Sequence, residues 1–182
     1  MDFQNSIIDH YISNWGGTPL LYLWDKGPID KLPIDFRVLE FEPTPFRNMW
    51  TYATCCMSEP VEINPIELHI FSGKKDESII ELLTSVAFYH HNTAKLNLHD
   101  TINFGRPWTQ NSLCKFGYVS LPYLDGPKLE NLKIEKTHKF FWLIPITEKE
   151  KQYKRTFGYE KLEESFEKGL NYLDPNRQSS VE

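Results

Sequence analysis

The stretch FFWLIPITEKE, from Phe140 to Glu150, contains the two clearest structural signals in the sequence. Its first part, FFWLIPI, is an unbroken apolar run, which is typical of a β-strand that is covered on both faces. Thr147 and Glu150 then stand in the spacing T-x-x-E, which predicts a capping box at the start of a helix. The stretch therefore predicts a buried strand that is followed directly by a helix.

Further strands are predicted where apolar residues alternate, at IDFRVLEFE (34–42), WTYATCCM (50–57), IELHIF (66–71), TINFG (101–105) and CKFGYVSL (114–121). The alternation slips after Leu39, which predicts a β-bulge there. Helices are predicted at Phe3–Ser13, at Asp76–His91, after Thr147 and from about Tyr159. About five to six strands and four helices, not in strict alternation, predict an α+β fold with helices packed on a mixed sheet. The whole chain, residues 1–182, is expected to form a single domain.

Composition and charge exclude several classes of protein. Hydrophobic residues make up 40% of the chain and aromatic residues 14%, which suits a packed core and not a disordered chain. The net charge is -5 and no stripe of lysine and arginine occurs, so we expect no nucleic-acid partner. No apolar run reaches the roughly 18 residues of a membrane helix, and the N-terminus carries acids where a signal peptide would be basic. We therefore expect a cytoplasmic protein with no membrane partner.

Half of the chain's 6 histidines lie in FYHHNTAKLNLHDTINFG, residues 88–105. His90 and His91 are neighbours, so on a helix their side chains would point about 100° apart and could not both reach one metal ion. His90 also continues the apolar stripe of the preceding helix, which favours a structural role. His99 and Asp100 are typical of a turn at the start of a strand. The stretch therefore predicts the end of a core helix and the start of a strand, with no metal and no cofactor.

Signals of nucleophilic catalysis are weak. Cys114 lies in a strand-like run, where a thiol is more often a small buried hydrophobe than a nucleophile. Cys55 and Cys56 would point to opposite faces of a strand, so that at most one could be exposed. The sequence has no G-x-S-x-G elbow, no P-loop and no G-x-G-x-x-G. We predict that the protein is not an enzyme; a hydrolase using Cys114 or the histidines is the less favoured alternative. Three carboxylates are expected on a solvated strand face: Glu40, Glu42 and Glu67.

Several aromatic side chains are predicted in or beside loops, where protein interfaces often place their anchors. They are Tyr22, Trp24, Phe46, Trp50, Trp108 and Tyr123. Many of these rings are expected to close the core. The others, on an acidic surface, would suit a protein partner with a basic face.

Five segments, in the right order, resemble the suppressor of fused domain family. Relatives usually carry a glycine near the position of His99, and the likeness covers most of residues 10–181. The segments are the threonine-containing strand WTYATCCMS (50–58), the Glu-Leu strand IELHIF (66–71), LNLHDTINFG (96–105) after the long helix, FFWLIPITEKEKQYKRTFGYEKL (140–162), and DPNRQS (174–179), which fits the closing pattern D-x-x-R-x-S.

The resemblance implies a mixed-sheet α/β domain without catalytic residues. The animal family member is a two-domain regulator that holds a transcription factor by adding a short peptide strand to its sheet. This chain corresponds to the N-terminal of those two domains. Tyr89 and Asp100 fall where the animal protein has the tyrosine and aspartate that grip the peptide. Tyr89, His99, Asp100 and Trp108 are accordingly the expected partner-binding residues.

Single-domain bacterial members of the family resemble immunity proteins of polymorphic toxin systems. We therefore expect a non-enzymatic immunity protein that neutralises a toxin by direct contact. Its partner would be a toxin domain with a basic face, which docks on an acidic surface or an exposed strand edge. A regulatory scaffold that binds an intracellular transcription factor is the alternative. The sequence indicates no oligomeric state.

Overall fold

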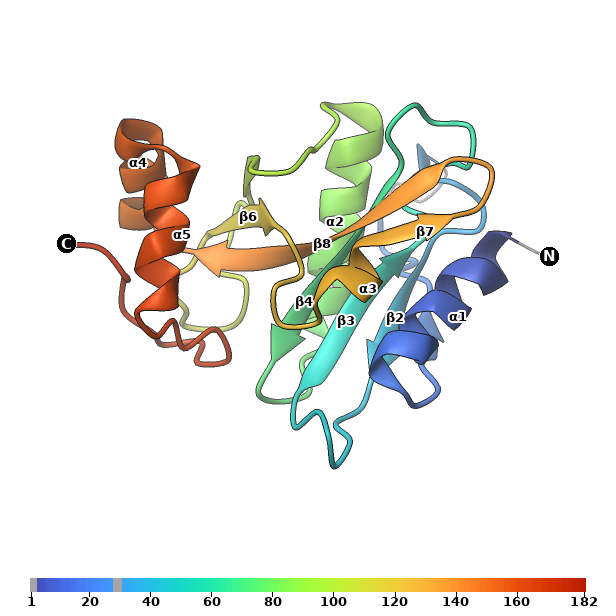
Figure 1. Cartoon of the computed structure of the whole chain (residues 1–182), viewed down its shortest axis with the longest axis horizontal. Coiled ribbons are helices and arrows are strands. Elements are labelled where there is room, and N and C mark those ends of the chain that lie inside the picture. Colours follow the sequence, from blue (N-terminus) through green and yellow to red (C-terminus); the bar gives the residue numbers. More distant parts are fainter. Residues whose placement is uncertain (1–2, 28–30) are drawn as a thin grey trace.

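The strands of the protein form one mixed, eight-stranded sheet in the part of the chain that the structure describes (Figure 1). The structure is a computed structural model that describes residues 3–27 and 31–182. The strands lie in the order β1-β2-β3-β4-β8-β6-β5, and β7 pairs with β8 outside this order. The strands are β1 (Leu20–Tyr22), β2 (Arg37–Phe41), β3 (Trp50–Cys55), β4 (Ile66–Ser72), β5 (Thr101–Asn103), β6 (Phe116–Ser120), β7 (Asn131–Lys133) and β8 (Thr137–Ile146).

The predicted α+β fold is confirmed, but the predicted strand count is too low. The sequence did not reveal β1 and β7, because each has only 3 residues and a strand so short shows no period of two. β1 lies within the proline-punctuated stretch that follows the first helix. Residues 28–30 of that stretch are outside the described residues.

Helices cover both faces of the sheet, which makes a three-layer structure (Figure 1). α2 packs on one face. The other face carries α1 at one end and the α4–α5 pair at the other. No helix in the described ranges is long and apolar enough to span a membrane. The helices are α1 (Phe3–Trp15), α2 (Ser78–Asn92), α3 (Pro127–Glu130), α4 (Glu148–Phe157) and α5 (Tyr159–Glu167).

β8 is the buried strand that the FFWLIPI run predicted. It pairs in parallel with β4 and antiparallel with both β6 and β7. Its side chains alternate between the faces, so that Phe141 and Leu143 lie in the core under α2. Phe140 lies in the core under α1, and Ile144 lies in the core under α5. Both faces of this strand are therefore covered.

The β-bulge predicted after Leu39 is absent. β2 pairs with β3 in a continuous register along its whole length. Val38 packs toward α2, whereas Leu39 and Phe41 pack toward α1. The alternation of apolar and polar residues slips because a strand covered on both faces needs no polar residue at every second position.

Two of the three carboxylates expected on a solvated face are buried. Glu40 is 0% exposed and its Oε1 lies 2.9 Å from Lys75 Nζ. Glu67 is also 0% exposed and accepts a hydrogen bond from the Thr54 hydroxyl at 2.5 Å. Burial raises the pKa of Glu67 to about 8. Glu42 is exposed, as expected. The expectation was wrong for Glu40 and Glu67 because central strands of a three-layer fold have no solvent face.

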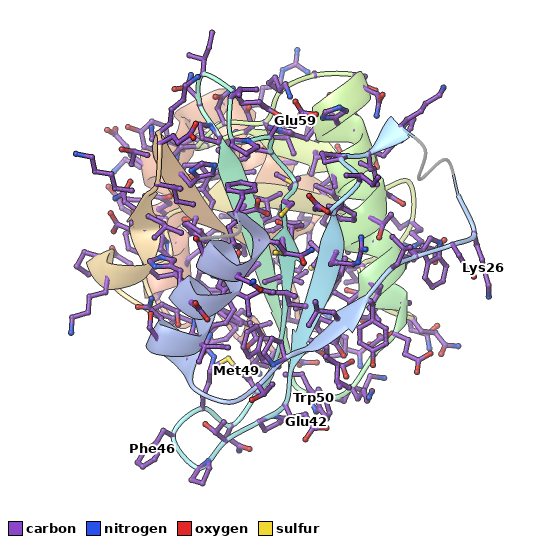
Figure 2. All side chains as sticks on the ribbon, turned by 90° about the vertical axis from the view of Figure 1, so that its right-hand side faces the viewer. Lys26, Glu42, Phe46, Met49, Trp50 and Glu59 are labelled. Atoms are coloured by element: carbon purple, nitrogen blue, oxygen red, sulfur yellow. The ribbon has the colours of Figure 1, made fainter. Side chains whose placement is uncertain are left out.

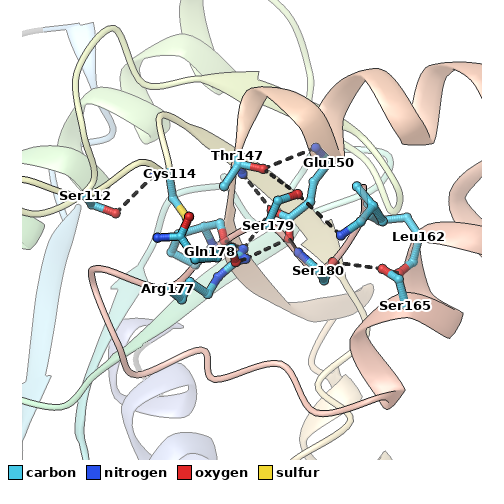
Figure 3. A network of polar contacts seen from close by, with 12 residues as sticks. Ser112, Cys114, Thr147, Glu150, Leu162, Ser165, Arg177, Gln178, Ser179 and Ser180 are labelled. Atoms are coloured by element: carbon cyan, nitrogen blue, oxygen red, sulfur yellow. Dashed lines mark hydrogen bonds and ion pairs between the residues drawn. The ribbon is translucent and has the colours of Figure 1, made fainter.

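The predicted capping box is present at the start of α4. Thr147 Oγ1 accepts a hydrogen bond from the Glu150 N–H, and Glu150 Oε2 accepts one from the Thr147 N–H. Glu150 is 0% exposed and forms a bidentate ion pair with Arg177 (Figure 3). Arg177 Nη1 donates to Glu150 Oε1 at 2.7 Å, and Nη2 donates to Oε2 at 2.8 Å. The Thr147 hydroxyl also donates to Ser179 Oγ. The arginine and serine of D-x-x-R-x-S therefore tie the C-terminal segment to the start of α4.

The loop aromatics differ widely in exposure. Phe46 is 100% exposed, at the tip of the hairpin between β2 and β3, where it points away from the sheet (Figure 2). Tyr123 is 59% exposed. Trp24 and Trp50 are half-buried against the core under α2. Sequence position alone therefore did not separate the rings that close the core from those that solvent can reach.

Candidate functional site

β5 is an edge strand, because it ends the strand order and pairs with β6 alone. The carbonyl of Asp100 and the N–H of Phe104 both bond toward the β6 side. Because bonding alternates along an antiparallel strand, the N–H and C=O groups of Thr101 and Asn103 point away from β6. No strand within the described ranges covers that side of β5. β5 therefore has an open edge at which a further strand could pair.

A β-bulge at His99 and Asp100 lies at the start of this edge strand. Its φ is 69°, in the left-handed region that favours glycine. The His99 N–H donates to the Val119 carbonyl at 2.8 Å, and the Val119 N–H donates to the Asp100 carbonyl at 2.9 Å. Two residues thus face one, as in a G1 bulge, whose first residue is usually glycine. The glycine that the resemblance placed near this position therefore has a conformational reason.

Asp100 closes the turn that leads into the bulge. Its N–H donates to the Asn97 carbonyl at 3.1 Å, and its Oδ2 accepts a hydrogen bond from the Asn97 N–H at 2.7 Å. One carboxylate oxygen of Asp100 is therefore used by the fold. A substitution of Asp100 would disturb the turn as well as any contact with a partner, so it is a poor test of binding.

The side chain of His99 joins this edge to α5, and its backbone joins it to α4. The Tyr118 hydroxyl donates to Glu163 Oε1 at 2.8 Å, so its oxygen accepts a hydrogen bond from His99 Nδ1, also at 2.8 Å. The His99 ring stacks on Tyr159, with ring centroids 3.7 Å apart. Burial lowers the pKa of His99 despite the nearby Glu163 carboxylate, which favours a neutral ring. Lys154 Nζ donates to the His99 carbonyl, so α4 also holds the backbone of the bulge.

Two hollows flank the open edge, one on each face of the sheet. The first has a volume of about 280 Å³, lies between α2 and β5, and is lined by Tyr89 and Ile102. The second has a volume of about 540 Å³, lies toward the start of α4, and is lined by Lys115 and Glu148. Asn103 lines both. Because side chains alternate along a strand, a strand added at β5 would direct successive side chains toward opposite faces, where these hollows lie.

The structure brings three of the four expected contact residues to this edge. Tyr89 is half-buried in the first hollow, and His99 and Asp100 form the bulge that begins β5. Trp108 is 1% exposed and lies in the core under α2. Its loop folds back over the core, where the Trp108 N–H donates to the Cys114 carbonyl at 3.0 Å. The expectation that a partner contacts the Trp108 ring is therefore corrected, because a buried ring offers no contact surface.

His90 has the structural role that its place in the helical stripe predicted. It is 1% exposed, and its Nδ1 accepts a hydrogen bond from the Leu96 N–H at 2.9 Å, so Nε2 carries the ring proton. Ser58 Oγ and Glu62 Oε2 lie 3.4 and 3.8 Å from that same Nε2. A catalytic triad needs an unprotonated nitrogen facing the serine and the acid at the other nitrogen. Ser58, His90 and Glu62 therefore do not form a triad.

The three thiols are buried. Cys56 has a φ of 62°, which places its side chain beside that of Cys55 under α1, with the sulfurs 3.9 Å apart. The expectation that these two cysteines face opposite ways was therefore wrong. Burial raises the pKa of Cys114, which disfavours the thiolate. Within residues 3–27 and 31–182, no group of three or more His, Cys, Asp or Glu could hold a metal ion.

The sequence did not reveal the residues that hold His99 and the β5 edge in place. Tyr118, Lys154 and Glu163 come from β6, α4 and α5, and they meet His99 only in the folded chain. In the sequence, Glu163 falls on the polar side of the helix predicted from about Tyr159, a position that is typical of a solvated residue. No local signal distinguished it from its neighbours Glu164 and Glu167.

Comparison with known proteins places this fold in a family. The family model described as Suppressor of fused protein (SUFU) matches residues 31–178. A protein from Neisseria gonorrhoeae, described as a suppressor of fused homologue, has a crystal structure that is similar with a TM-score of 0.87 and 31% identity. That similarity covers 100% of this chain and 98% of the Neisseria chain. Comparison with curated proteins gives no match.

Two further solved structures share the fold at lower identity. A structure described as the Sufu–Fu complex is similar with a TM-score of 0.71 and 16% identity, over 98% of this chain and 92% of that chain. Drosophila Suppressor of Fused is similar with a TM-score of 0.68 and 16% identity, and this chain covers 51% of its length. From the family match and the likeness to the Neisseria protein, we conclude that the chain belongs to the suppressor of fused family.

Proposed function

We propose that this protein is a non-enzymatic binding domain that pairs a strand of a protein partner with β5. The observation that carries the proposal is the open edge at Thr101 and Asn103, with a hollow on each face. Backbone pairing would supply affinity, and the hollows would select side chains on alternate faces. The family and the fold shared with a protein solved as the Sufu–Fu complex support a protein partner.

More specifically, we propose that the protein is a cytoplasmic immunity protein and that its partner is a toxin domain with a basic face. The net charge of -5 favours such a partner, because opposite charges steer and orient association. Tyr89 lines the first hollow, where it would contact a partner side chain, and His99 and Asp100 lie at the start of the strand that would be paired. A scaffold that binds an intracellular transcription factor is the alternative outcome of the same test.

The substitution Asn103→Pro tests strand pairing directly. Proline has no N–H, and its ring would occupy the side on which a partner strand pairs. The Asn103 N–H points away from β6, so its loss removes no hydrogen bond from the sheet. Asn103→Thr is the matched control: both variants lose the hydrogen bond from the Gly105 N–H to Asn103 Oδ1, but threonine keeps the backbone N–H. Both should fold, which circular dichroism checks.

The assay is affinity capture from the native cells with tagged wild-type protein and the two variants, followed by mass spectrometry. We expect Asn103→Thr to capture the same partner as the wild type and Asn103→Pro to lose it. Equal capture by both variants would show that the partner binds elsewhere on the surface.

A growth assay tests the immunity role. The captured partner is expressed in a susceptible bacterium together with each form of the protein. Protection by the wild type and by Asn103→Thr, but not by Asn103→Pro, is the expected result. A captured DNA-binding regulator that does not affect growth would instead favour the scaffold.

A further inference from the structure

A third hollow, of about 430 Å³, lies between α5 and the sheet, away from the β5 edge. It is at the lower end of the roughly 300–1,000 Å³ range of ligand pockets, which suits one long side chain. Its walls include Trp142, which is buried, and Tyr172, whose ring meets Trp142 edge to face at 5.2 Å. Phe166 and Tyr123 complete the aromatic lining.

The Glu163 carboxylate lies at one wall of this hollow. It accepts hydrogen bonds from three hydroxyls, those of Tyr118 at 2.8 Å, Ser120 at 3.2 Å and Tyr123 at 3.3 Å. These donors fix the position of the carboxylate but carry no charge. In the described part of the chain, the one basic side chain within 4 Å of it is His99, at 3.7 Å. No lysine or arginine there neutralises Glu163, so its negative charge faces an aromatic hollow without a cation.

The same chain shows what such surroundings accept. Arg47 lies 4.9 Å from the ring centroids of both Trp15 and Phe71, and its Nη1 pairs with Asp125 Oδ1 at 2.5 Å. A planar guanidinium fits this combination, because it stacks on aromatic faces and donates to a carboxylate in its own plane. The hollow beside Glu163 offers the same two elements, a carboxylate and aromatic rings.

We propose that this hollow binds an arginine side chain presented by a protein partner. The guanidinium would donate to Glu163 Oε2, which accepts a hydrogen bond from the Tyr123 hydroxyl alone among the residues that the structure describes, and the aliphatic stem would lie against the aromatic walls. The inference rests on the proposed function for the nature of the partner. No β5 residue lines the hollow, although Glu163 also supports the β5 edge through its contact with Tyr118 and His99.

The probe is an acetylated and amidated hexapeptide with one central arginine, and its control is the same peptide with citrulline, which has the same shape but no charge. Binding to the wild-type protein is followed by chemical-shift changes in two-dimensional NMR at millimolar peptide. We expect the arginine peptide to shift the signals of Trp142 and its neighbours. The citrulline peptide should bind at least about tenfold more weakly, because it loses the charge-assisted hydrogen bond.

Two substitutions on α5 make the test specific to the site. Glu163→Gln keeps an acceptor for the hydroxyls and removes the charge, and it should weaken the arginine peptide at least about tenfold. Glu164→Gln is the matched control, because Glu164 is exposed and already pairs with Lys161 at 2.8 Å. It should leave binding unchanged.

Equal binding of the arginine and citrulline peptides would overturn the proposal. This comparison uses the unmodified protein, so it decides the question even where Glu163→Gln fails to fold. Tighter binding of agmatine, a free alkylguanidinium, than of the peptide would overturn the assignment to a protein side chain. Asn103→Pro should bind the arginine peptide normally, so failure at β5 and failure at this hollow are distinguishable.

Discussion

The buried ion pair between Glu150 and Arg177 makes a large and specific contribution to stability. Arg177 donates to both carboxylate oxygens of Glu150, at 2.7 and 2.8 Å, and also to the Pro145 carbonyl at 2.6 Å (Figure 3). The substitution Arg177→Met keeps the bulk of the side chain but leaves Glu150, at 0% exposure, with backbone N–H donors alone. Breaking a buried pair from one side costs about 3–5 kcal/mol. We therefore expect a loss of that size in the free energy of unfolding.

A double-mutant cycle separates the charge from the packing. Glu150→Gln removes the partner charge and keeps the capping box, since glutamine also serves at that position. The double variant Glu150→Gln/Arg177→Met should therefore be more stable than Arg177→Met alone, by about 0.5–3 kcal/mol. Urea unfolding followed by tryptophan fluorescence and circular dichroism measures all four proteins. The effect should persist at high salt, because buried pairs are screened little.

The pH dependence of the same pair has a fixed sign. Burial alone would raise the pKa of Glu150, but the hydrogen bonds and charge of Arg177 hold it below its ordinary value. A carboxyl whose pKa is lowered in the folded state contributes stability above its unfolded pKa of about 4.3, and this stability is lost as the pH falls below that value. A loss of less than about 1 kcal/mol for Arg177→Met at pH 7, or a double variant no more stable than the single one, would refute this account of the pair.

Two further predictions concern the core. Burial lowers the pKa of His69 to about 4, below its unfolded value of about 6.5. The contribution of His69 to the free energy of unfolding is therefore fully present above about pH 6.5, and up to roughly 3 kcal/mol of it is lost as the pH is lowered toward 4. His69→Leu should flatten this part of the plot of unfolding free energy against pH. An unchanged slope would assign the loss to other groups. In Gly117→Ala, the new Cβ would lie 2.6 Å from Leu143 Cδ1 and 2.6 Å from the Phe104 ring, so we expect a loss of about 1–3 kcal/mol in urea unfolding. Gly27→Ala, with nothing within 4 Å of the added Cβ, is its control, and equal stability of the two variants would contradict the packing argument.

The parts of the fold that the sequence predicted are those with a strong local pattern. The stripe that begins at Ile79 and ends at His90 is buried along α2, and the run at Phe140–Ile146 is the buried strand β8. The capping box at Thr147 is present because its two partners are three residues apart. In each case, the residues that determine the structure are neighbours in the chain.

What the sequence did not predict depends on contacts between distant residues. Glu67 stands between apolar residues that face α2, so a period of two places it outward. Outward in this fold means toward the α1 layer, where Thr54 and the Met57 N–H bind its carboxylate. The candidate site divides in the same way. The resemblance pointed to Tyr89, His99 and Asp100, but the bulge at His99 and the support from α4 and α5 arise only when the chain is folded.

The size of β5 explains why a partner should need more than backbone pairing. Its two outward residues, Thr101 and Asn103, offer one N–H and one C=O each. Hydrogen bonds of this kind contribute about 0.5–1.5 kcal/mol net, so together they would contribute roughly 2–6 kcal/mol. Association costs an estimated 4–15 kcal/mol in lost freedom, so pairing with β5 alone does not hold a partner.

Contacts with side chains of the partner must supply the rest of the binding free energy. The residues around β5 are already ordered in a way that favours such contacts. Lys154 fixes the backbone at His99, and Tyr118 links the His99 ring to Glu163, so the edge is already ordered before a partner arrives. An ordered edge lowers the entropic cost of binding. The short strand also limits non-specific pairing with other edges, because an edge of three residues is a poor template by itself. Selectivity then depends on whether the partner also fills the hollows beside Asn103 and, in our proposal, places an arginine beside Glu163.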